Sequence, residues 1–361
     1  MYPINTYQYV LDEGIMKFSL LTLTSLLLIS GFSEAQQSKH YVAPVPTGAI
    51  PTNSTIHLDP WTASNVQHAY GLPETKPKVK GVIVIDNAGL TFNGEASRYT
   101  IPWADTVAIS NGVERVEMWG TTGRIVRMAI PNGGGLAAAG VMHHRVHELT
   151  VEFRDRRGAY HGAVFFLPGN DATRVLDIYT RAVQPMQQHV DMGALPAEPA
   201  PTCQNTESRS VLVAAPAWNE TQVPAAYRAM VYEHIVDRMQ RVEGVDHVFR
   251  DGEAGPQPVC PRYTVSISIV SFKPGNQVQR AMTGPVGFFA GTTQMVFNAT
   301  IRDASGRLNS SQEVKATVRG EGESKNITDG VAKKIAKSYA NTTKQFEKAT
   351  LTARADNPLP R

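Results

Sequence analysis

The chain has 361 residues, of which 42% are hydrophobic and 19% charged, and its formal net charge is +3. This apolar content excludes a chain that is disordered throughout, and at about 100–200 residues per domain the length suggests two domains. The small net charge, with no block of Lys and Arg, argues against nucleic acid as a partner.

The first clear pattern is an export signal. Met16 and a lysine precede an apolar run over residues 18–30, and small residues end at Ala35. This pattern predicts a signal peptide over residues 1–35, cleaved after Ala35, with Met16 as the true start because two acidic residues precede it. An uncleaved anchor is the alternative, although about 13 apolar residues are short for a membrane span of about 20. No other segment could span a bilayer, so we expect a periplasmic or secreted protein.

Residues 36–77 are polar and contain six prolines, which predicts an extended leader. Residues 78–183 contain short apolar and alternating segments that predict one β-rich domain. Its predicted strands are Val82–Ile85, Leu90–Phe92, Thr106–Ser110, Val113–Trp119, Arg124–Ile130, Leu149–Phe153 and Ala159–Leu167. Apolar residues at a spacing of 3–4 then predict a helix from Ala172 to Val183.

The segments GVIVIDNAGLTF and YTIPWADTVAIS, followed by the late helix, resemble bacterial pleckstrin-homology-like (PH-like) and GRAM-type domains. The resemblance implies a small β-barrel or sandwich that is closed by one helix.

Prolines and small residues over 184–209 predict a linker. We expect residues 210–350 to form a second domain. Its elements follow the order β-α-β-β-β-β-α, which indicates a mixed-sheet α+β domain with two helices. The predicted elements are Val211–Ala215, a helix from Pro224 to Val242, His247–Phe249, Tyr263–Ile269, Met295–Ile301, Val314–Val318 and a helix over Ile327–Phe346. We expect residues 351–361 to form a tail.

The strand before Pro224, the helix ending at Gly244, the loop over residues 284–291 and the hairpin at Gly306 carry a second resemblance. Over about residues 205–350 the chain resembles a bacterial envelope lipoprotein-type domain of unassigned function. In outline this is similar to the N-terminal domain of the Tol-system propeller protein and to curli-secretion lipoproteins. The chain departs from that pattern because no lipid-attachment cysteine follows the apolar run.

The chain has two cysteines, Cys203 and Cys260, and an even number in an exported protein favours a disulfide. If the strands beginning at Ser210 and Tyr263 are parallel neighbours, both cysteines lie at one end of the sheet. Two free thiols are the alternative.

His143, His144 and His147 are the densest group of metal-ligating residues. Their spacing matches no metalloprotease motif, and His147 is in phase with the strand over Leu149–Phe153, so a loop-to-strand junction is the competing interpretation. The sequence also lacks the G-x-S-x-G elbow of serine hydrolases and a complete P-loop. These observations predict no catalytic residues and no cofactor.

Phe288 and Phe289 lie on a glycine-rich loop, where they are either tucked under the sheet or offered to a partner. We therefore expect a non-enzymatic binding or assembly module of the bacterial cell envelope, with an envelope protein or a membrane-associated partner. The alternative is a metal-dependent hydrolase that uses the three histidines.

Overall fold

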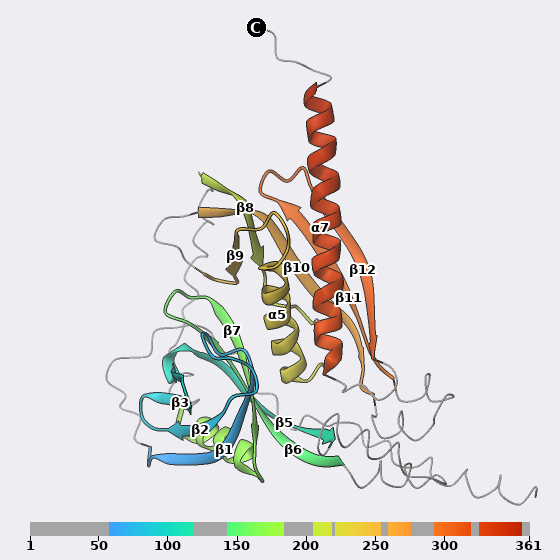
Figure 1. Cartoon of the computed structure of the whole chain (residues 1–361). Helices are drawn as coiled ribbons and strands as arrows, with labels where there is room; N and C mark the ends of the chain where they lie inside the picture. Colours follow the sequence, from blue (N-terminus) through green and yellow to red (C-terminus); the bar gives the residue numbers. More distant parts are fainter. Residues whose placement is uncertain are drawn as a thin grey trace, which may run out of the picture. The chain divides into compact units, whose positions relative to one another are not determined.

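The computed structural model describes residues 58–117, 143–183, 205–218, 221–253, 259–275, 292–318 and 325–355. Within these ranges the protein is α+β, with two β-sheets and three α-helices (Figure 1). The predicted fold class is therefore confirmed at this level. No helix in the described ranges is long and apolar enough to cross a membrane.

The first sheet has seven strands in the order β4-β3-β2-β1-β7-β6-β5. Its strands are β1 (Trp61–Tyr70), β2 (Lys80–Ile85), β3 (Gly89–Gly94), β4 (Arg98–Pro102), β5 (Thr106–Glu117), β6 (His143–Arg154) and β7 (Tyr160–Leu167). The edge strands β4 and β5 do not pair with each other, so the described strands form an open sheet. Of the expected barrel or sandwich, the described strands therefore do not form a closed barrel.

The sheet buries one large apolar core, into which Phe92, Phe153 and Phe165 project. The short helix α3 (Asp171–Ile178) follows β7, as predicted, and continues as a π-helical turn over Tyr179–Val183. Burial raises the pKa of the Tyr179 hydroxyl to about 12. The helix therefore covers the core at the position that its apolar spacing predicts.

Several boundaries differ from those expected, among them the limits of β1 and β5. Strand β1 lies inside the stretch interpreted as an extended leader, and it pairs with both β2 and β7. Its apolar residues are interrupted by a register shift between Ala63 and Val66, so no regular period reveals the strand. Strand β5 runs on without a break to Glu117, so the strand predicted to begin at Val113 is its continuation. The rest of the predicted hairpin lies outside the described residues.

The second sheet has five strands in the order β12-β11-β10-β8-β9. Its elements are β8 (Asn205–Val213), α5 (Ala225–Met239), β9 (His247–Arg250), β10 (Val259–Lys273), β11 (Thr293–Asp303), β12 (Asn309–Val318) and α7 (Asn326–Ala355). This confirms the predicted β-α-β-β-β-β-α order. Strand β8 begins inside the segment assigned to the linker.

Helices α5 and α7 cover one face of this sheet and share a single apolar core with it (Figure 1). Alternation in β10 and β11 places Val265, Ile267 and Phe297 in that core. Helix α5 begins after Pro224, whose carbonyl accepts the backbone N–H groups of Tyr227 and Arg228. After the helix, Gly244 takes the left-handed conformation at φ +88°, which glycine adopts without steric cost.

Candidate functional site

Helix α5 packs against both sheets. Its predicted apolar stripe faces the second sheet, whereas Ala226 and Ala229 on another side contact Val164 of β7. A Cβ atom on Gly162 of β7 would lie 2.5 Å from the Cβ of Ala229. Small residues on both elements therefore allow the helix and the strand to approach closely. As a result, charged side chains of α5 contact strands of the first sheet.

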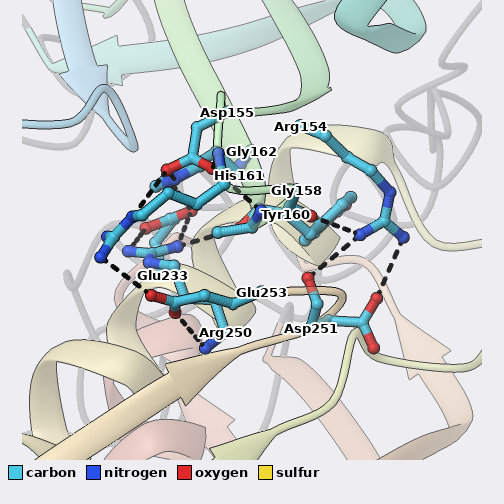
Figure 2. Close-up of polar contacts among 12 residues, drawn as sticks. Arg154, Asp155, Gly158, Tyr160, His161, Gly162, Glu233, Arg250, Asp251 and Glu253 are labelled. Carbon is cyan, nitrogen blue, oxygen red and sulfur yellow. Dashed lines mark hydrogen bonds and ion pairs between the residues drawn. The ribbon is translucent and has the colours of Figure 1, made fainter. Parts of the chain in front are cut away.

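A bidentate ion pair lies at this contact (Figure 2). The Glu233 carboxylate of α5 accepts hydrogen bonds of 3.0 and 2.8 Å from the Arg250 guanidinium of β9. Glu233 also accepts the backbone N–H of Gly162 at 3.0 Å, and Arg250 donates to the Tyr160 carbonyl at 3.1 Å. The Glu233 side chain is only 4% exposed, so this pair directly joins α5, β7 and β9 in a nearly dry environment.

A second buried pair connects α5 to β6. The Arg228 guanidinium donates to Glu152 at 3.1 Å, and the other carboxylate oxygen of Glu152 accepts the Tyr160 hydroxyl at 2.9 Å. Arg228 also lies over the ring of Trp218, with 3.9 Å from its guanidinium carbon to the ring centroid. Burial, together with the Glu152 carboxylate, raises the pKa of Tyr160 well above its usual value, so this hydroxyl stays a hydrogen-bond donor.

His161 lies between two carboxylates at the centre of the cluster (Figure 2). Its Nε2 is 3.6 Å from Asp155 and its Nδ1 is 3.8 Å from Glu233, and neither nitrogen has a hydrogen-bond partner among the described residues. The ring stacks on Phe153. Burial and the nearby Arg250 guanidinium lower the pKa of His161, although both carboxylates oppose this shift. The imidazole is therefore neutral near pH 7.

The turn between β6 and β7 completes the contact. Arg154 donates to the Asp251 carboxylate at 3.2 Å and to the backbone carbonyls of Gly158 and Asp251 at 2.8 and 3.1 Å. Arg157 forms an ion pair of 3.1 Å with Glu253. The backbone N–H of Tyr160 donates to the Asp251 carbonyl, so the first sheet also bonds the segment after β9 through its main chain.

The buried carboxylates in this cluster are occupied by partners within the chain. Glu152 and Glu233 each bind an arginine and one further donor, which satisfies their acceptors and holds the two sheets together. A cleft of about 360 Å³ lies elsewhere, between β12 and the first turns of α7. The carboxylates of Glu152 and Glu233 therefore form ionic contacts between elements of the two sheets.

The three histidines singled out from the sequence share one strand. His143, His144 and His147 all belong to strand β6, where their backbones pair with β5. The described side chains include no group of three or more His, Cys, Asp or Glu that could hold a metal ion. Phe288 and Phe289 lie outside the described residues, so their role stays a prediction.

Cys203 also lies outside the described residues, so its pairing with Cys260 stays a prediction. The prediction assumed that the strands beginning near Ser210 and Tyr263 are parallel neighbours. This assumption is confirmed, because β8 and β10 pair in parallel, with Cys260 opposite Thr206. The Cys260 side chain is buried.

The cluster itself is not predicted by the sequence pattern. Arg228 and Glu233 lie off the apolar stripe of α5, where charged residues normally face solvent. The available signal was the pair of small residues Ala226 and Ala229 on the same helix, because small residues allow a second element to approach.

The comparisons with known proteins assign no family. No family model and no curated protein match the chain. A dodecameric PelC variant from Paraburkholderia phytofirmans is 15% identical to it; the similarity covers 36% of this chain and 86% of that chain, at a TM-score of 0.27. The crystal structure of an uncharacterized protein is 9% identical, and the similarity covers 40% of this chain and 99% of that chain, at a TM-score of 0.21. Similarities this weak carry no functional conclusion.

Proposed function

We propose that the chain is an exported, non-enzymatic binding and assembly module of the bacterial cell envelope, located in the periplasm or secreted. The observation that carries the proposal is the buried ionic contact between the sheets. Its buried carboxylates bind donors within the chain, and these bonds link elements of the two sheets. Such internal contacts suit a protein that presents outer surfaces to partners.

The topology supports the finer part of the proposal. Four consecutive antiparallel strands, three further strands and a helix after β7 are compatible with a PH-like first domain. The β-α-β-β-β-β-α order of the second part is compatible with the envelope lipoprotein-type domain. PH-like folds bind through sheet and loop surfaces, so the proposed function needs no catalytic residues.

The experiment combines cell fractionation with N-terminal sequencing of the exported chain. We expect the protein outside the cytoplasm with a mature terminus at Gln36. Retention in the cytoplasm with an intact Met1 or Met16 terminus would overturn the proposal.

Metal analysis distinguishes this function from the alternative, a metal-dependent hydrolase using His143, His144 and His147. We expect no stoichiometric zinc in protein purified without added metal. One zinc per chain that is lost in the His147→Ala variant would instead support the hydrolase.

A further inference from the structure

Helix α7 carries a row of lysines on its exposed side. The helix has 30 residues, and from Ile327 to Phe346 one side of it packs into the core of the second sheet. Lys333, Lys337, Lys344 and Lys348 are exposed on the other side. At 100° per residue their positions fall within a sector of about 60°, and at 1.5 Å per residue the row is about 22 Å long. The row is therefore straight and faces one direction.

The positive charge of this row is not neutralised within the described part of the chain. None of the four lysines forms an ion pair there, whereas the neighbouring carboxylates on α7 are occupied. Glu347 pairs with Arg262 at 3.4 Å, and Asp329 pairs with Arg238 at 2.6 Å. The lysine ammonium groups are left to attract an anionic partner.

An apolar side chain lies in the same sector. Leu351 follows Lys333 by five helical turns and is 68% exposed, the highest exposure among the large hydrophobic side chains described. A leucine among lysines gains little from phosphates of a nucleic acid. At a bilayer it can enter the boundary between headgroups and acyl chains while the lysines meet anionic headgroups.

We propose that this lysine face of α7, defined by Lys333, Lys337, Lys344, Lys348 and Leu351, binds the surface of an anionic lipid bilayer. The proposal rests on the envelope location proposed above and names an anionic bilayer as the partner of that module. A flat bilayer can meet all four lysines at once because the row is straight. Each lysine close to an anionic surface contributes about fivefold to binding.

The test is flotation of the purified exported chain with vesicles of 30% phosphatidylglycerol in phosphatidylcholine. Pure phosphatidylcholine vesicles measure any contribution from an apolar N-terminal segment. We expect binding that requires phosphatidylglycerol and weakens as salt rises from about 0.1 to 1 M, where the Debye length falls from about 10 to 3 Å. Replacing the four lysines with Gln should weaken it at least about 100-fold.

The matched control replaces four exposed lysines elsewhere, Lys76, Lys78, Lys80 and Lys273, with Gln. It removes the same net charge and should retain most of the binding. Equal losses in the two variants would show that binding follows net charge, which would overturn the proposal. So would wild-type binding that does not require phosphatidylglycerol.

The Leu351→Ser variant distinguishes a lipid bilayer from other anionic partners. This variant should weaken vesicle binding and leave binding to a single-stranded oligonucleotide unchanged. Tighter binding to the oligonucleotide than to the vesicles would assign the face to nucleic acid and refute the bilayer. If the exported chain has its Gln36 terminus but does not bind the vesicles, the bilayer proposal fails while the envelope function stands.

Discussion

Replacing Glu233 with Gln tests whether the buried ion pair holds the two sheets together. The change keeps the shape of the side chain but removes its charge and places an amide NH₂ group against the donors of Arg250. The Arg250 side chain is 17% exposed, so water compensates little for the lost carboxylate. Breaking a buried pair by altering one partner costs about 3–5 kcal/mol, which is a large share of a typical stability of about 5–15 kcal/mol.

The measurement is equilibrium unfolding in urea followed by circular dichroism, with Asp246→Asn as the control. Asp246 pairs with Arg209 at 3.0 Å, but these side chains are 64% and 60% exposed, so we expect a loss below about 1 kcal/mol. Because Glu233 joins the sheets, its variant should also separate the unfolding transition into two steps. A loss no larger than that of the control, with one unchanged transition, would refute the argument that this pair unites the sheets.

Three further predictions concern packing, pH and the cysteines. Gly162→Ala should destabilise the fold by about 1–3 kcal/mol through overpacking, and adding Ala229→Gly should recover part of that loss in a double-mutant cycle; simple additivity would contradict the close contact. The folded-state pKa of His161 lies below its ordinary value of 6.5, so the unfolded chain binds more protons and stability falls as the pH drops below about 6.5. The His161→Leu variant should lose less stability than the wild type between pH 7 and 5. A urea midpoint that falls equally in both proteins over this range would contradict the expectation. Non-reducing mass spectrometry should find linked peptides of Cys203 and Cys260, whose loop of about 58 residues corresponds to roughly 4 kcal/mol in the chain-entropy model, before strain; two alkylatable thiols in oxidised protein would rule the bridge out.

The local pattern of apolar residues was enough to predict most elements. Alternation in Tyr263–Ile269 and 3–4 spacing in α5 and α7 reflect which face of a single element is buried, and a sequence records that directly. The helix after Pro224 and the order of the elements along the second part of the chain were predicted for this reason, whereas the order of the strands within the sheet was not. Strand β1 was missed because its bulge interrupts the period.

Only the tertiary structure decided what the charged residues do. In the sequence Glu233 is an acidic residue on the polar side of a helix, and its contact with Arg250 and Gly162 depends on segments up to 71 residues away. Lys333 likewise lies on the polar side of its helix, α7, but there it is exposed. The sequence around the two residues does not show that one faces solvent and the other a second sheet. A sequence shows which residues are polar, but whether a polar face meets solvent or a second sheet depends on how the elements pack, and that packing is set by contacts between distant segments.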